Sequence, residues 1–217
     1  MLYSEQVRTP YKKKGEKRMV LSLQGCMAVG KTTAARYMQA HLPEVHVSLE
    51  YNTGVVEEVR RRRLNKKRYE DYLEIQKLWL QNEVARWQDA QRYPYTVMDF
   101  GAEEIEFYTL NYPKSCGLSW RTEEIEHALQ PELTAVRQCM PEHILFLDAS
   151  ETVLRARKTG DSTRSREFFE HYVMHLLPLK REWFRKRENV TFLQTDDLTP
   201  EETGEQVTHW CEHCIGT

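Results

Sequence analysis

The chain has 217 residues, of which 40% are hydrophobic and 29% charged, and its formal net charge is −2. This length suits one α/β domain with a sizeable core and is short for two, while the composition is that of an ordinary globular protein. The balanced charge argues against a dedicated nucleic-acid binder and against a protein drawn to anionic membranes.

The cysteines and the apolar segments suggest where the protein resides. Five cysteines occur at spacings that do not suggest a disulfide framework, which favours reduced thiols. The apolar run at residues 19–23 is too short for a signal peptide, and no stretch approaches the roughly 20 apolar residues of a membrane helix. We therefore expect a cytoplasmic protein with no membrane partner, and homodimer formation stays open.

Strand and helix patterns alternate along the chain. A flexible basic arm is expected over residues 1–18, and a single domain over 19–217. Apolar runs predict strands at 19–24, 45–50, 95–100, 144–148 and 190–193. Helices are expected at 31–42, 72–90 and 103–110, from 122, after 150, at 168–184 and from 200 to about 211, with a loop at 111–120. This order predicts an α/β fold with a five-stranded parallel sheet and helices on both faces.

Residues 25–32 (GCMAVGKT) match the phosphate-loop pattern G-x-x-x-x-G-K-[ST], and they lie between a predicted strand and a predicted helix. The glycines let the backbone curl so that its N–H groups point at phosphate oxygens. Lys31 would contact the β- and γ-phosphates, and the Thr32 hydroxyl can ligate Mg²⁺. We predict ATP and Mg²⁺ as cofactors, with the nucleotide held by Gly25, Cys26, Met27, Ala28, Val29, Gly30, Lys31, Thr32 and Thr33.

Other segments narrow the class of P-loop protein. The base-reading motif of GTPases is absent, since residues 65–68 read NKKR, and a hexameric ATPase or a helicase would need a longer chain. The chain resembles the P-loop nucleoside and nucleotide kinases, most clearly the deoxynucleoside kinase group. The resemblance rests on the glycine loop and on the segments SLE (48–50), LEIQKLWL (73–80), VMDFG (97–101) and LFLDAS (145–150), with the arginine-rich stretch after the last. One departure is Phe100, which stands where the group usually has an arginine.

The resemblance implies roles for residues beyond the glycine loop. Glu50 and Asp99 follow two strands and compete for the role of catalytic base; the group favours Glu50, with Asp99 serving Mg²⁺ or the substrate. Gln76 would read the base of a nucleoside. A lid at about residues 158–166 would close over the phosphates, and the arginines predicted to neutralise charge there are Arg155, Arg164 and Arg166.

Each of these residues also has a structural explanation. Acids at strand ends and arginines in a polar stretch are often simply solvated, and a buried glutamine can bond to the backbone. The basic run at residues 60–68 is either a solvated loop or a substrate-entry loop that attracts an anion.

Three functions remain open from the sequence. The first is ATP-dependent phosphoryl transfer to a nucleoside or nucleotide. The second is a P-loop kinase for another small metabolite, and the third is an ATP-hydrolysing or ATP-sensing protein with a protein partner. The sequence does not distinguish the acceptor or show which acid is the base.

Overall fold

A computed structural model describes residues 18–159 and 166–216 of the chain. Five parallel strands form one sheet in the order β2-β3-β1-β4-β5. The strands are β1 (Met19–Gly25), β2 (Val45–Ser48), β3 (Tyr95–Asp99), β4 (His143–Asp148) and β5 (Val190–Gln194). The register aligns Leu23 with Asp99 and Gly25 with Leu147, so β1, β3 and β4 end at one edge of the sheet.

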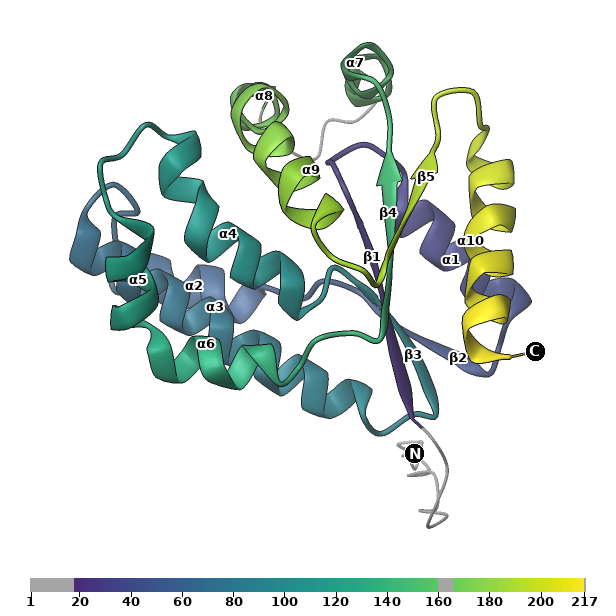
Figure 1. The fold of residues 1–217 in the computed structure, drawn as a ribbon, viewed down its shortest axis with the longest axis horizontal. Helices are drawn as coiled ribbons and strands as arrows, with labels where there is room; N and C mark the ends of the chain where they lie inside the picture. Colours follow the sequence, from purple (N-terminus) through teal and green to yellow (C-terminus); the bar gives the residue numbers. More distant parts are fainter. Residues whose placement is uncertain (1–17, 160–165, 217) are drawn as a thin grey trace, which may run out of the picture.

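Helices cover both faces of this sheet (Figure 1). On one face, α1 (Lys31–His41) and α10 (Pro200–Ile215) pack against each other. The other side holds α2 (Thr53–Arg61), α3 (Tyr69–Ala90), α4 (Ala102–Ser115), α5 (Thr122–Ala128), α6 (Gln130–Arg137), α8 (Arg166–His171) and α9 (Leu177–Arg185), with a π-helical turn at Tyr172–Leu176. The helix α7 (Glu151–Thr159) follows β4 at the carboxyl edge.

The sheet is the centre of the hydrophobic core. All seven residues of β1 are buried, as expected for a central parallel strand. The core cluster around the sheet joins Leu23 and Phe146 to Met38 of α1. A second cluster, which includes Tyr72 and Leu133, lies between α3, α4, α5 and α6. These four helices therefore form a layer with its own core beside the sheet.

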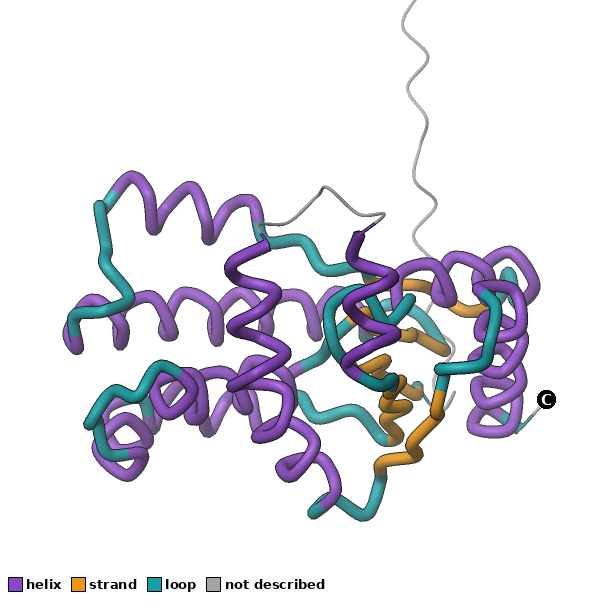
Figure 2. The backbone as a smooth tube through the Cα atoms, turned by 90° about the horizontal axis from the view of Figure 1, so that it is seen from above, coloured by secondary structure: helices purple, strands orange, loops and turns teal. Residues whose placement is uncertain are grey.

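The carboxyl edge of the sheet is where the predicted site residues gather. Viewed from above in Figure 2, the strands form a narrow band with helices on both sides. The phosphate loop and Glu50 follow β1 and β2, respectively, and Asp99 is the last residue of β3. Ligands of open α/β sheets bind at this edge, so the topology places the predicted residues where such a site is expected.

The parallel five-stranded sheet and its two helical layers confirm the predicted fold class. The predicted loop at 111–120 is wrong in its first part, because α4 continues to Ser115 and includes Pro113. A proline in a helix leaves the carbonyl four residues earlier without its N–H donor. Here the Tyr72 hydroxyl donates to the Thr109 carbonyl at 2.8 Å, which satisfies that oxygen.

Other boundaries also differ from the sequence-based prediction. The helix α2 was not predicted, and it takes up Arg60 and Arg61 from the basic run. Much of the predicted basic arm and lid lies outside the described residues, so both stay predictions.

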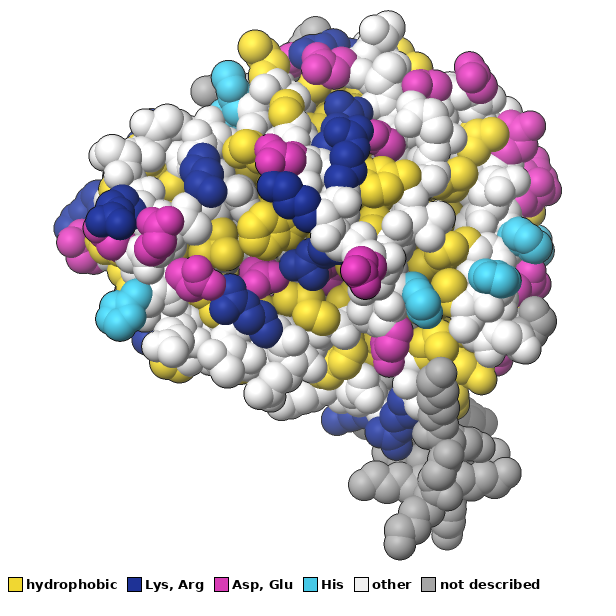
Figure 3. Space-filling model, in the orientation of Figure 1, with side chains coloured by type: hydrophobic (Ala, Val, Ile, Leu, Met, Phe, Trp, Pro, Cys, Tyr) yellow, Lys and Arg dark blue, Asp and Glu magenta, His cyan; other side chains and the backbone are white. Residues whose placement is uncertain are grey.

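The surface shows no dominant sign of charge on the face in view. In Figure 3, Lys and Arg side chains are interspersed with Asp and Glu. In the part of the chain that the structure describes, no helix combines the length and apolar character that crossing a membrane requires.

Candidate active site

The phosphate loop links β1 to α1 and has the backbone geometry that its glycines predict. Gly25 has φ 137°, and a Cβ placed there would lie 2.3 Å from the carbonyl oxygen of Leu147. Gly30 has φ 103° and precedes the first residue of α1, and Ala28 also adopts a left-handed conformation. These conformations curl the chain into a concave turn above the helix N-terminus, a geometry that binds phosphate through backbone N–H groups.

Lys31 is held inside this turn. Its side chain is buried, and its Nζ donates to the carbonyl oxygen of Cys26 at 3.0 Å. The ammonium also lies 4.1 Å from the centre of the Phe100 ring, whose residue has an unusual φ of 59°. Burial lowers the pKa of Lys31 to about 8, although the charge of Asp99 opposes this shift. A phosphate group in the loop would compensate the desolvated ammonium.

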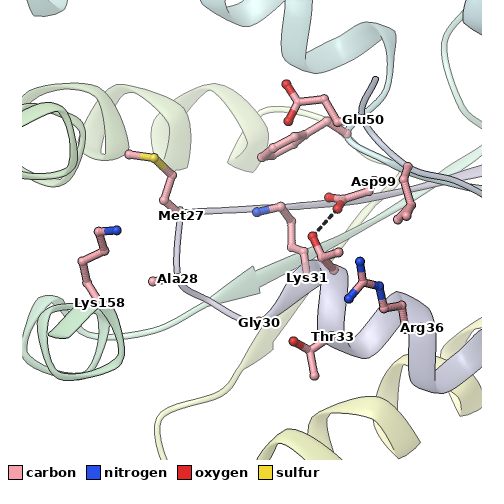
Figure 4. Close-up of a pocket in the computed structure, with 12 residues that line it drawn as sticks. Met27, Ala28, Gly30, Lys31, Thr33, Arg36, Glu50, Asp99 and Lys158 are labelled. Atoms are coloured by element: carbon pink, nitrogen blue, oxygen red, sulfur yellow. Dashed lines mark hydrogen bonds between the residues drawn. The ribbon is translucent and has the colours of Figure 1, made fainter. Parts of the chain in front are cut away.

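Thr32 and Asp99 meet at the carboxyl ends of β1 and β3. The Thr32 hydroxyl donates to Asp99 Oδ2 at 2.6 Å, as the dashed line in Figure 4 shows. Asp99 Oδ1 is buried and has no hydrogen-bond partner among the described residues. A hydroxyl and a carboxylate with a spare buried oxygen are the hard ligands that Mg²⁺ prefers, so the pair fits this cation. Arg86 supports the arrangement by donating to the carbonyl oxygens of Ser48 and Asp99 at 2.8 and 3.0 Å.

A cavity of about 410 Å³ opens over these groups. Two further cations line it (Figure 4): Arg36 of α1, which the sequence analysis did not select, and Lys158 of α7, the first residue of the predicted lid. Arg36 lies four residues after Thr32, a spacing that places both side chains on one face of a helix and could have identified it. The cavity is lined by Met27, Ala28, Gly30, Lys31, Thr32, Thr33, Arg36, Leu49, Glu50, Asp99, Phe100 and Lys158.

A second cavity of about 310 Å³ shares Met27, Glu50 and Phe100 with the first. We call it the aromatic cavity, because aromatic side chains line much of it. Its other lining residues are Asn52, Gln76, Trp79, Glu104, Ile105, Tyr108, Phe168 and Tyr172. The predicted residues Glu50 and Gln76 therefore share one cavity that adjoins the phosphate loop.

Glu50 and Gln76 occupy different environments within the aromatic cavity. Glu50 is exposed at the junction of the two cavities, and the Asn52 side chain donates to it at 3.3 Å. Gln76 is only 2% exposed, and its Oε1 accepts a hydrogen bond from the Thr109 hydroxyl at 3.0 Å. No described residue accepts from its Nε2, which leaves the amide donors available to a ligand in the cavity.

Glu104, which lines the aromatic cavity, belongs to an ion pair that the sequence analysis missed. Lys180 of α9 is wholly buried, and its Nζ lies 2.6 Å from Glu104 Oε2. The same ammonium donates to the Gly25 carbonyl at 3.1 Å and to the Tyr172 hydroxyl at 3.2 Å. Burial raises the pKa of Glu104, and the charge of Lys180 opposes this shift. The spacing of Leu176, Lys180 and Phe184 along one helix face was the available signal.

Of the three arginines predicted to neutralise charge beyond β4, only Arg155 has a described side chain. Arg155 pairs with Glu170 and Glu151 and does not line either cavity. Arg157 instead supports the loop from behind, donating to the carbonyl oxygens of Val29 at 3.3 Å and Thr195 at 2.6 Å. Arg164 lies outside the described residues, and Arg166 begins α8.

Asp148 accepts from Arg181 in a bidentate ion pair, which ties β4 to α9.

Comparisons with solved structures agree with this fold. A thymidylate kinase from Candida albicans is 14% identical with a TM-score of 0.66, and the match covers 92% of this chain and 93% of that one. A deoxyadenosine kinase from M. mycoides, solved with bound dATP, is 13% identical with a TM-score of 0.65, covering 92% of this chain and 100% of the other. This confirms the resemblance to P-loop nucleoside and nucleotide kinases at the level of the fold.

Comparison at the level of sequence gives the family. No curated protein sequence matches the chain. A family model described as an AAA domain matches residues 20–173, which include the phosphate loop, Glu50, Gln76 and Asp99. The chain therefore belongs to this AAA domain family, and it has the fold of the P-loop nucleoside and nucleotide kinases.

Proposed function

We propose that this protein is a kinase that transfers a phosphoryl group from ATP to a nucleoside or nucleotide held in the aromatic cavity. The observation that carries the proposal is the junction of the two cavities at Met27, Glu50 and Phe100. A donor bound in the phosphate loop and an acceptor bound beside it would meet at this junction. Phosphoryl transfer depends mainly on such positioning and on neutralisation of charge.

Residues on the two sides of the junction have distinct roles in this mechanism. ATP would supply the phosphoryl group, and Mg²⁺ at Thr32 and Asp99 would neutralise phosphate charge. Lys31 stabilises the negative charge that develops on the phosphate oxygens, with Lys158 and Arg36 as further cations at the cavity wall. Glu50 lines both cavities and accepts the proton of the attacking hydroxyl. Of these two cavities, Asp99 lines only the one over the phosphate loop, which supports a role for it in binding the metal.

The aromatic cavity supports a ring-bearing acceptor. Trp79, Tyr108 and Phe168 supply aromatic surface against which a base can pack, and the Gln76 amide offers donors to its edge. The cavity volume of about 310 Å³ is at the lower end of the range for small-molecule sites. These features favour a nucleoside or nucleotide over a small aliphatic alcohol.

ADP release measured with ATP, Mg²⁺ and a panel of nucleosides, nucleotides, sugars and vitamins tests the proposal. We expect turnover only with members of the nucleoside and nucleotide class. Glu50→Gln should lower kcat by about 10²-fold or more with little change in ATP affinity. Asp99→Asn should raise the Mg²⁺ concentration needed for half-maximal rate. Glu57→Gln and Asp89→Asn are matched controls, because these acids line neither cavity.

Other outcomes identify the alternatives. Turnover with a sugar or a vitamin alone would indicate a metabolite kinase of another class. Hydrolysis of ATP that no acceptor stimulates, but that a protein does, would indicate an ATP-hydrolysing switch. If Glu50→Gln raised the Mg²⁺ requirement and Asp99→Asn lowered kcat, the roles of Glu50 and Asp99 would be reversed, but the class of reaction would stay the same.

A further inference from the structure

A third cavity, of about 260 Å³, continues from the aromatic cavity on the side away from the phosphate loop. The two cavities share Gln76, Trp79 and Tyr108. The other described residues of this far cavity are Val56, Val59, Leu64, Lys66, Tyr72, Ile75 and Tyr112. The three cavities thus form a succession from the phosphate loop, through the aromatic cavity, to the far cavity.

Lys66 is the one charged side chain among the described residues that line the far cavity. Its ammonium lies 4.8 Å from the centre of the Tyr112 ring and 5.5 Å from that of Phe168. Phe168 also lines the aromatic cavity. The ammonium is therefore held over aromatic faces at the boundary between the two cavities, an arrangement that favours a cation.

Lys66 differs from paired neighbours in the same basic run. Arg61 pairs with Glu58, and Arg62 pairs with Glu74. No carboxylate of the described residues lies within ion-pair distance of Lys66. Burial around the ammonium lowers the pKa of Lys66 although the residue as a whole is exposed. A partly desolvated cation without an acidic partner gains free energy when an anion binds beside it.

Charge along the succession of cavities orients such an anion. Glu50 and Glu104 line the aromatic cavity, and neither lines the far cavity. An anionic group is attracted by Lys66, and no described carboxylate lines the far cavity to repel it. Its favourable position is therefore the end remote from the phosphate loop, while the hydroxyl that receives the phosphoryl group lies near Glu50.

We propose that the acceptor is a nucleoside whose ring carries an anionic substituent, such as a carboxylate, that binds Lys66 in the far cavity. This inference rests on the proposed kinase function and specifies its substrate class. The ring would lie among Trp79, Tyr108 and Phe168, with Gln76 at its edge. Lys66 is then a specificity residue that selects the substituent, and it takes no part in the transfer step.

Binding and turnover of isosteric ribosides test this selection. The two ribosides of a pair have the same ring, and one bears a carboxylate where the other bears a carboxamide. The pairs cover pyridine, pyrimidine and imidazole rings. Thermal shift of the full chain with ATP and Mg²⁺ measures binding, and ADP release measures turnover. We expect at least one carboxylate to bind about 10-fold or more tightly than its carboxamide, because a hydrogen bond to a charged group is a strong one.

Variants assign the preference to one side chain. Lys66→Met should abolish the preference for the carboxylate, and Lys66→Arg should keep most of it. The matched control Lys67→Met should leave the preference unchanged, because Lys67 does not line the far cavity. Melting of each variant without ligand checks that the fold is intact. A carboxylate preference that survives in Lys66→Met, or no preference in any pair, would overturn the inference.

The two proposals fail separately. Turnover of neutral nucleosides with no preference for a carboxylate would retain the kinase and reject the role of Lys66. A carboxylate-dependent thermal shift that Lys66→Met removes, without ADP release from any riboside, would retain the binding site and reject the kinase.

Discussion

Lys180 Nζ and Glu104 Oε2 lie 2.6 Å apart in an ion pair whose lysine side chain is wholly buried. The lysine also donates to the Gly25 carbonyl and to the Tyr172 hydroxyl. Three elements, β1, α4 and the π-helical turn, are therefore joined at one ammonium group. π-Helical turns are often found at functional sites, and this one contributes Tyr172 to the aromatic cavity.

Lys180→Met should lower the free energy of unfolding by about 3–5 kcal/mol, because Glu104 would be left as a buried charge without its partner. The double variant Lys180→Met/Glu104→Gln should recover part of this loss. Urea denaturation measures both. Lys186→Met is the control, since its pair with Glu182 is exposed and its loss should change little. Equal stability of the single variant and the wild type would mean that the buried pair does not form in solution.

The affinity for ATP should depend on pH through Lys31. The folded protein without nucleotide has a Lys31 pKa of about 8, lowered from 10.5 by burial. Phosphate binds the charged lysine, so ATP affinity should be constant below pH 8 and fall as the pH rises above it. The stability of the free protein should change in the opposite direction. Between pH 8 and 10.5 the unfolded chain holds a proton on Lys31 that the folded protein has lost, so the free energy of unfolding should rise with pH in this range.

Titration of ATP affinity by calorimetry from pH 7 to 10 measures this effect. Lys31→Met should bind ATP more weakly at pH 7 and show a flatter profile above pH 8. A wild-type affinity that stays constant to pH 10 would show that Lys31 keeps its charge in the free protein.

Arg157 and Arg155 should differ in their effect on the phosphate loop although they are two residues apart. Arg157 donates to the Val29 carbonyl and to Thr195, whereas Arg155 pairs with acids on α7 and α8. Arg157→Ala should lower stability by about 1–3 kcal/mol, since buried acceptors lose a charged donor, and should weaken ATP binding. Arg155→Ala should leave ATP affinity near the wild-type value. A larger loss of turnover in Arg155→Ala would favour the catalytic role predicted from the sequence.

Local and topological signals made much of the fold, and the residues that line the candidate site, predictable. The glycine loop is defined by adjacent residues, and buried parallel strands are apparent as short apolar runs. Asp99 and Glu50 could be selected because parallel strands bring their carboxyl ends to one edge. These inferences need no knowledge of how distant side chains pack.

The features that were missed depend on contacts between residues far apart in the chain. Pro113 continues α4 because a tyrosine of α3 satisfies the carbonyl that the proline leaves without a donor. Glu104 lies in the first turn of α4, where an acid is expected at the surface. It is instead buried, in an ion pair with Lys180 of α9. The left-handed backbone of Phe100 places its ring close to two ammonium groups, those of Lys31 and Lys180, and no sequence pattern indicates this conformation.

Two glycines in helices should respond in opposite ways to alanine. Gly204 lies in α10, and a Cβ there would be 2.4 Å from Cγ of Tyr37 on α1. The Tyr37 ring is stacked on His41 with 4.1 Å between centroids, and the close atoms belong to the base of its side chain, so it cannot simply rotate away. Gly204→Ala should therefore cost about 1–3 kcal/mol through overpacking, partly offset by the better helix propensity of alanine. Gly54 is the second residue of α2 and has no heavy atom within 4 Å of its added Cβ, so Gly54→Ala should be neutral or slightly stabilising. Urea denaturation of both variants measures the difference, and an unchanged midpoint for Gly204→Ala would mean that α1 and α10 pack less closely than the structure shows.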